Sequence, residues 1–248
     1  EELGDKSMIA ACLGNIGGLY YNQYSIDRAL DHLKRALAIF EELGDKNGMA
    51  KYLHALGAVY DYKGKADIAL DNFKRSFAIA EELGNKHRMA KTLMSIGVMH
   101  SQKGDHDKAL DDYERALLIA EELGNKSAKG FILRNTGILY KEVGENDKAL
   151  GYFDRSLTIF KELGLKGRTT YLLNLIGTAY GNKGDWDKTL DYYKRSLAIE
   201  EEIGDKSGIC FSLALIGSLY GSKGEYGIAL DYYEKSLAIR KEIGNKLL

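Results

Sequence analysis

The sequence contains no proline, only two cysteines and no long hydrophobic run. Cys12 and Cys210 lie near opposite ends of the chain, and two such separated cysteines give no disulfide framework, which favours a reduced compartment. No stretch approaches the roughly 18 apolar residues that a membrane-spanning helix needs, and no basic-then-apolar leader opens the chain. These absences predict a soluble, cytoplasmic protein with no membrane partner.

The chain also lacks an excess of charge of either sign. Lysine plus arginine number 35 and aspartate plus glutamate 36, for a formal net charge of -1. Such a chain has no global field that would gather nucleic acid or an anionic membrane. A nucleic-acid partner is a weak hypothesis, because the basic residues that would track phosphates form no continuous stripe: Lys51, Lys91, Arg134 and Lys141.

One six-residue segment organises everything else. Glu41-Glu42-Leu43-Gly44-Asp45-Lys46 recurs with small changes beginning at residues 1, 81, 121, 161, 201 and 241. Repetition at a fixed period is the signature of stacked supersecondary units. We therefore interpret residues 1–248 as a single array, with repeats at about 5–44, 45–84, 85–124, 125–164, 165–204 and 205–244.

Each repeat predicts two amphipathic helices. In the first repeat, Ile9, Leu13, Ile16 and Tyr20 form one apolar helical stripe, and a second stripe begins near Ser25 or Asp27, with Asp105 and Asp185 as capping residues in later repeats, and ends at Gly44. Left-handed stop residues are expected between the helices at Gly64, Gly104, Gly144, Gly184 and Gly224, with Tyr24 in the first repeat. The predicted fold is all-α, with about twelve antiparallel helices and no strand.

A glycine stands inside the first helix of every repeat, although glycine there costs about 1 kcal/mol relative to alanine. The column is Gly17, Gly57, Gly97, Gly137, Gly177 and Gly217. We expect the second helix of the same repeat to approach closely at this column. The small residues predicted to meet it are Ala29, Ala69, Ala109, Ala149 and Ala229, with Thr189 as the exception.

Charged pairs spaced i, i+4 recur on the second helix, as in Asp31 with Arg35 and Asp111 with Arg115. Each pair contributes a few tenths of a kcal/mol. We interpret this charge-rich side as a solvated convex face rather than a binding surface.

The spacing of Leu13, Gly17, Tyr20, Ala29, Leu33 and Ala36 resembles the tetratricopeptide repeat, and the match recurs in all six units. The chain departs from that family in lacking the proline that commonly closes the repeat, so its second helix runs on to Gly44. The extended forty-residue unit is similar to those of kinesin light chains, Pins-type adaptors and bacterial tetratricopeptide regulators. The resemblance implies a right-handed α-solenoid whose first helices line a concave groove for partner peptides.

The residues that would carry catalysis or bind a metal are not arranged to do so. The histidines show no metal-ligand spacing, and no nucleophile elbow or phosphate-binding loop is present; they are His32, His54, His87, His100 and His106. His100 stands where other repeats have tyrosine, and we interpret it as a structural substitute. We therefore expect no enzyme activity, no metal and no cofactor.

The first-helix positions that point away from the second helix vary between repeats, and these are the predicted groove residues. Phe131, Tyr171 and Phe211 share one column and predict an aromatic wall, with Arg134 placed to hold a carboxylate and Asn174 to hold backbone groups. The alternative is that these aromatics pack between neighbouring first helices. The full predicted groove is Lys51, His54, Lys91, Phe131, Arg134, Lys141, Tyr171, Asn174, Asn182 and Phe211.

The leading functional hypothesis is a non-enzymatic protein-interaction scaffold that binds a partner peptide carrying acidic and apolar side chains. The alternatives are a regulatory sensor domain of a larger signalling protein and a self-assembling structural spacer. Repeat arrays need polar caps at their ends, and the last repeat has no capping helix after its apolar residues. End-to-end self-association, or a longer native chain, is therefore expected from Leu213, Ile216, Leu230, Leu237 and Ile239.

Overall fold

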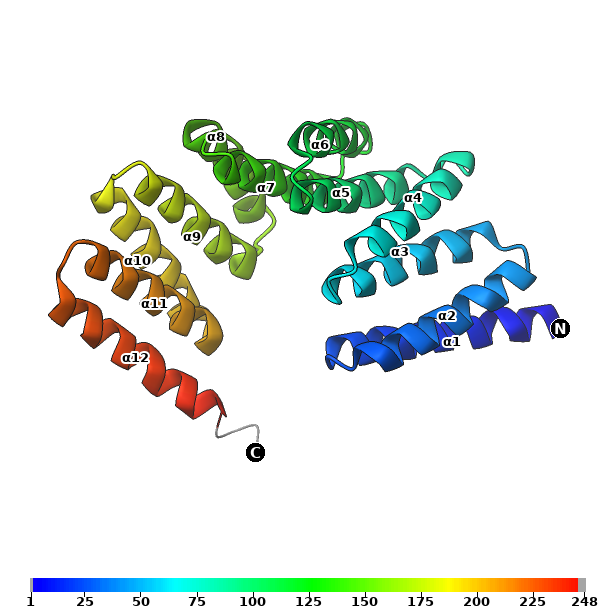
Figure 1. The fold of residues 1–248 in the computed structure, drawn as a ribbon, viewed down its shortest axis with the longest axis horizontal. Coiled ribbons are helices and arrows are strands. Elements are labelled where there is room, and N and C mark those ends of the chain that lie inside the picture. The colour runs from blue at the N-terminus through cyan, green and yellow to red at the C-terminus, as the bar shows by residue number, and fades with distance from the viewer. Residues whose placement is uncertain (1, 245–248) are drawn as a thin grey trace. The chain divides into compact units, whose positions relative to one another are not determined.

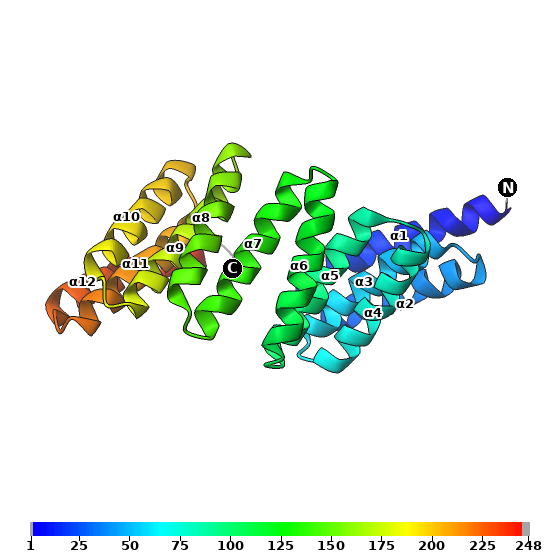
Figure 2. The same ribbon diagram turned by 90° about the horizontal axis from the view of Figure 1, so that it is seen from above.

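The computed structural model describes residues 2–244, with side chains from residue 5 onward, and these residues contain helices and turns but no strand. They divide into two compact units, Glu1–Ala128 and Lys129–Leu248, which we call the N-terminal unit and the C-terminal unit. The predicted all-α fold of repeated helix pairs is confirmed, as Figures 1 and 2 show within each unit.

The helices of the N-terminal unit are α1 (Glu2–Asn22), α2 (Ile26–Glu42), α3 (Lys46–Tyr62), α4 (Ala66–Glu82), α5 (Lys86–Gln102) and α6 (His106–Glu122). The boundary between the units falls in the first turn of α7 (Lys126–Glu142), and the C-terminal unit contains the rest of α7 with α8 (Asn146–Glu162), α9 (Lys166–Asn182), α10 (Trp186–Ile203), α11 (Lys206–Ser222) and α12 (Tyr226–Gly244). Consecutive helices pack together from α1 to α6 and from α8 to α12, for example α3 on α4 within a repeat and α4 on α5 between repeats. Each odd-numbered helix is the first helix of its repeat.

The turns between helices have the predicted left-handed residues. The predicted stop glycines of repeats two to six have φ between 71° and 83°, and Tyr24 takes the same role in the first repeat at φ 59°. Asp185 caps α10 as expected, because its Oδ1 accepts a hydrogen bond from Lys188 N at 3.1 Å. The second helix of the first repeat begins at Ile26, close to the predicted start near Ser25 or Asp27. The expectation that Asp105 caps α6 is wrong, because its side chain makes no cap bond.

The glycine column contacts the second helix of its own repeat, as predicted, but the nearest atoms belong to a large side chain rather than to the small residue expected there. A Cβ built on Gly57 would lie 2.6 Å from Phe73 Cε1, and one on Gly97 would lie 2.6 Å from Tyr113 Cε1. The space above the glycine is therefore filled by a large side chain four residues beyond the alanine column. The alanine contributes its backbone carbonyl, since a Cβ on Gly217 would lie 3.2 Å from Ala229 O.

Exposed apolar residues mark the helices that have a neighbour on one side only. In α1, Ile9 is 53% exposed, although the periodicity placed it on the buried stripe, because no helix precedes α1 within the described residues. In α12, Leu230 and Leu237 are 57% and 53% exposed. Leu213 and Ile216, which were also expected on this end face, are instead buried in α11.

Candidate functional site

The N-terminal unit contains a pocket of about 430 Å³ formed mainly by α1, α3 and α5. It brings together three of the predicted groove residues, Lys51, His54 and Lys91, and adds Arg88 and Tyr52. We call these five residues and the space they enclose the cationic pocket. The rest of its lining is mostly small or apolar, with the polar side chains of Asn15 and Tyr21, and the small or apolar members are Gly14, Gly18, Leu33, Ala55, Ala58 and Val59.

The three cations of the cationic pocket have no acidic partner among the described residues. Lys51 and Lys91 are exposed and Arg88 is half-buried. None of the three forms an ion pair among the described residues, whereas other lysines do, such as Lys6, which pairs with Glu42 at 2.6 Å. Partial burial, followed by the nearby Arg88, lowers the pKa of Lys91, and burial lowers the pKa of Arg88. This pocket therefore concentrates positive charge that nothing in the unit neutralises.

The ring of Tyr52 closes the cationic pocket toward α1. A Cβ on Gly14 would lie 2.0 Å from Tyr52 Cε1, so only glycine leaves room for this ring. Tyr52 is 2% exposed and stacks on Phe40 with ring centroids 5.3 Å apart. Its hydroxyl is buried without a hydrogen-bond partner in the described structure, as is Arg88 Nε. Buried polar groups left unpaired cost roughly 1 to 3 kcal/mol, so both atoms favour a bound group.

His54 lies at the centre of the cationic pocket and is neutral. Burial, followed by Lys91 and Arg88, lowers its pKa from 6.5 to about 3. Its ring lies 5.1 Å from that of Phe73, and its Nδ1 is 3.3 Å from Thr92 Oγ1. His54 therefore shapes the pocket without adding to its charge at neutral pH.

In the C-terminal unit, two of the three predicted wall aromatics are joined by arginines. The guanidinium of Arg134 lies over Phe131 and Tyr171, with its Cζ 5.1 and 5.8 Å from the ring centroids. Arg168, which the sequence analysis did not predict, also lies over Phe131, with its Cζ 5.3 Å from the ring centroid. The wall is therefore an alternation of rings and guanidinium groups rather than a row of empty apolar surfaces.

The wall residues differ in how far they are available to a ligand. Phe131 is half-buried and packs on Phe160 of α8, the second helix of its own repeat, with ring centroids 5.2 Å apart. Tyr171 and Phe211 are 43% and 51% exposed. The Nε and Nη2 atoms of Arg134 both donate to Asn135 Oδ1, at 3.2 and 2.9 Å, so the edge of the guanidinium suited to a carboxylate is already engaged.

The other predicted groove residues lie apart from these clusters. Asn174 is 4% exposed and donates through Nδ2 to Ser212 Oγ at 3.3 Å, so it is an inter-helix contact in this structure. Asn182 donates through Nδ2 to Asn146 Oδ1 at 3.3 Å and lines a different pocket beside Trp186. Lys141 is half-buried in the last turn of α7.

A signal for Arg88 was present in the sequence. Arg88 precedes Lys91 by three residues on α5, and residues three apart share a helix face. Tyr52 gave no such signal, because its column belongs to the buried side in other repeats, where Thr92 and Leu172 are fully buried. Only the glycine at position 14 allows a large ring at this column to reach α1.

Other chemistry is sparse in the part of the chain that the structure describes. No three histidine, cysteine, aspartate or glutamate side chains gather there to hold a metal ion. His100 is buried in its tyrosine column, and its Nδ1 lies 2.7 Å from Asp112 Oδ2. None of the described helices is long and apolar enough to cross a membrane.

The fold and its repeated helix pairs define a helical-repeat protein of the interaction-scaffold class. The chain belongs to the tetratricopeptide repeat family, whose model matches residues 8–82, 88–162 and 168–242. No curated protein matches the chain.

Solved structures similar to this chain share its fold at low sequence identity. The crystal structure of BtubC (BKLC) from P. vanneervenii is 20% identical, with 89% of this chain and 90% of that chain covered and a TM-score of 0.72. A Rap protein complexed with competence and sporulation factor is 18% identical, with 94% and 75% covered and a TM-score of 0.71. A signal transduction ATPase with a tetratricopeptide repeat sensor from Pyrococcus horikoshii is 16% identical, with 98% and 38% covered and a TM-score of 0.77.

Proposed function

We propose that this chain is a non-enzymatic scaffold that holds a peptide segment of a partner protein, with a carboxylate of that segment in the cationic pocket. The single observation that carries the proposal is the set of cations there, Lys51, Arg88 and Lys91, without an acidic partner among the described residues. A carboxylate brought among them would form charge-assisted hydrogen bonds, which are stronger than neutral ones.

The rest of the cationic pocket suits a carboxylate attached to an apolar body. The volume of about 430 Å³ lies within the range of ligand pockets, roughly 300 to 1,000 Å³. The lining also includes Ala55, Ala58 and Val59, which follow Lys51 along α3, and this favours an apolar side chain next to the acidic one. The unpaired Tyr52 hydroxyl and Arg88 Nε supply two further donors for the carboxylate.

The part of the pocket that would accept a carboxylate does not extend along the whole of α3. Asp61, three residues beyond Ala58, is half-buried, and burial raises the pKa of its carboxyl. A second carboxylate at that end would be repelled whenever Asp61 is ionised. We therefore place the acidic group of the partner at the Lys51, Arg88 and Lys91 end.

The test uses a capped peptide, acetyl-Leu-Glu-Ala-Leu-Glu-amide, and its glutamine counterpart as probes for isothermal titration calorimetry. We expect the acidic peptide to bind about tenfold more tightly, because a hydrogen bond to a charged group contributes roughly 1.5 to 3 kcal/mol. Lys91→Glu should abolish this preference. Equal binding of the two peptides by the parent protein would show that the cations do not select a carboxylate.

A matched control separates the pocket from overall charge. Lys74→Glu makes the same charge change at an exposed lysine on α4, outside the lining of the cationic pocket. It should leave the affinity for the acidic peptide within about twofold, because exposed charges more than a Debye length of roughly 8 Å away are screened. An equal loss from Lys74→Glu and Lys91→Glu would reduce the effect to net charge and reject the site.

A further inference from the structure

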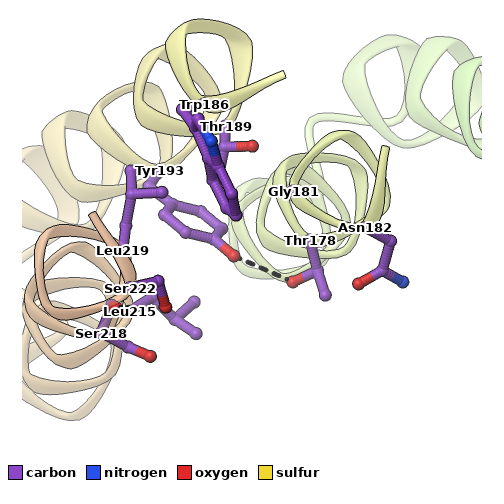
Figure 3. A pocket seen from close by; sticks show the side chains of 10 residues that line it. All are labelled: Thr178, Gly181, Asn182, Trp186, Thr189, Tyr193, Leu215, Ser218, Leu219 and Ser222. Carbon is purple, nitrogen blue, oxygen red and sulfur yellow. Dashed lines mark hydrogen bonds between the residues drawn. The ribbon is translucent and has the colours of Figure 1, made fainter. Parts of the chain in front are cut away.

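A second pocket, of about 240 Å³, lies between α9, α10 and α11 in the C-terminal unit (Figure 3). Trp186 and Tyr193 reach from α10 toward α9, where Tyr193 meets Thr178. The other lining residues are Gly181, Asn182, Thr189, Leu215, Ser218, Leu219 and Ser222. No lining side chain carries a charge, so this pocket differs in chemistry from the cationic pocket.

Four of the five hydroxyl groups that line this pocket have committed their hydrogens to other acceptors, namely those of Thr178, Thr189, Tyr193 and Ser222. Thr178 Oγ1 donates to Asn174 O at 2.9 Å, so the 3.1 Å contact with Tyr193 uses the tyrosine hydrogen. A hydroxyl has one hydrogen and two lone pairs. Tyr193 Oη, which belongs to a side chain only 5% exposed, therefore retains a lone pair and has no hydrogen to offer.

The same accounting applies to the neighbouring oxygens. Thr189 Oγ1 donates to Asp185 O at 2.8 Å, and Ser222 Oγ donates to Ser218 O at 3.0 Å. Asn182 uses one Nδ2 hydrogen on Asn146 Oδ1, which leaves one N–H donor and its own Oδ1 acceptor. The pocket therefore offers hydrogen-bond acceptors in excess of donors, which favours a ligand rich in N–H groups.

The aromatic side of the pocket favours positive charge. Trp186 is 40% exposed, and a Cβ on Gly181 would lie 4.0 Å from its Cζ3 atom, so the hydrocarbon edge of the indole rather than its N–H borders the space over Gly181. Tryptophan and tyrosine rings attract ammonium and guanidinium groups through their quadrupoles. Glycine at position 181 keeps this space open, because it carries no side chain.

We propose that this pocket binds a primary ammonium group, such as the lysine side chain of a partner segment. Its N–H donors would find acceptors among the lining oxygens, such as the remaining lone pair of Tyr193 Oη, while the indole of Trp186 would stabilise the charge. The site is independent of the proposed carboxylate site, since it lies in the other unit and selects the opposite charge. A carboxylate would find few donors here.

The probe is n-butylammonium chloride, and the readout is the indole of Trp186, the only tryptophan in the chain. We expect saturable shifts of the single indole N–H resonance and of the fluorescence spectrum. Butylammonium should bind at least fivefold more tightly than n-butanol or sodium butyrate. Tetramethylammonium, which has no N–H, should bind more weakly than butylammonium. Equal binding of butylammonium and butyrate, or of butylammonium and tetramethylammonium, would overturn the assignment.

Opposite charges at one exposed lining residue give the sharper test. Ser222→Asp should strengthen butylammonium binding and Ser222→Lys should weaken it, each by about threefold or more. The matched control is Ser207→Asp and Ser207→Lys at an exposed position in the first turn of the same helix, about 22 Å away at 1.5 Å per residue. Shifts of the same sign at Ser222, or equal shifts at Ser207, would show that the pocket does not recognise the cation.

Discussion

Gly137 of α7 lies directly beneath the ring of Phe153 of α8: a Cβ added to the glycine would be 2.6 Å from both Cδ1 and Cε1 of the ring. The same relationship links Gly57 to Phe73 and Gly177 to Tyr193. In these repeats, the contact between the aromatic ring and the glycine backbone therefore sets the separation of the two helices. Phe153 is fully buried, so it has no free volume into which to move.

The first prediction concerns this contact. Gly137→Leu should lower the free energy of unfolding by roughly 1 to 3 kcal/mol or more, because the new side chain overpacks the helix pair. The matched control is Gly151→Leu in α8, where nothing lies within 4 Å of an added Cβ. The control should raise stability by up to about 1 kcal/mol, since glycine is a poor helix former. Urea denaturation measures both, and a change within 0.5 kcal/mol for Gly137→Leu would show the packing assignment to be wrong.

The second prediction follows from the depressed pKa of His54, about 3 in the folded protein against 6.5. Because the unfolded state binds the proton more tightly, the stability associated with neutral His54 is complete above pH 6.5 and falls as the pH drops toward 3. The loss at pH 5 should be about 2 kcal/mol.

His54→Met, which places the residue found at Met94 of the next repeat, should remove this part of the pH dependence. His87→Met, at an exposed histidine of α5, should leave it unchanged. Denaturation curves at pH 7 and pH 5 decide the matter. The prediction is wrong if the parent and His54→Met lose stability equally on acidification.

The third prediction separates packing from binding in the aromatic wall. Phe131→Ala should destabilise the protein by at least about 1 kcal/mol, because its ring packs on Phe160 and lies beneath two guanidinium groups. Tyr171→Ala and Phe211→Ala should change stability by about 0.5 kcal/mol or less, since both rings are largely exposed. Urea midpoints measure all three, and equal losses would mean that the whole wall is structural.

The fourth prediction concerns the apolar face of α12. Leu230 and Leu237 are more than half exposed, whereas their counterparts Leu150 and Leu157 in α8 are 8% and 7% exposed. The protein should therefore associate with itself at high concentration, as an uncapped repeat end favours. Sedimentation at increasing concentration should show dimers for the parent and monomers for Leu237→Lys.

The control for this association is Leu118→Lys, at an exposed leucine of α6. Leu118 lies in the N-terminal unit and is the only exposed large apolar side chain among the described residues of α6. Its replacement should therefore leave the dimer population unchanged. A parent protein that stays monomeric at millimolar concentration would contradict the prediction, as would equal effects of the two substitutions.

The predicted groove residues differ in where the structure places them. The columns placed Lys51, His54 and Lys91 on one side of the first helices, and the structure brings them into one pocket. They also placed Asn174 there, but it is buried against Ser212 of α11. A helical column gives a direction around one helix, whereas exposure depends on how closely the next helix approaches.

The sequence by itself determined the repeat, the helix pair, the left-handed turns and the family. These properties are local: apolar spacing at 3.6 residues per turn sets the helices, and glycine at positive φ sets the turns, within a few residues of chain. The large side chain above each glycine of the column, the pairing of Tyr52 with Gly14 and the acceptor-lined pocket beside Trp186 were decided only by the tertiary structure. Each depends on side-chain volume and hydrogen-bond direction across neighbouring helices, which no spacing within one helix encodes.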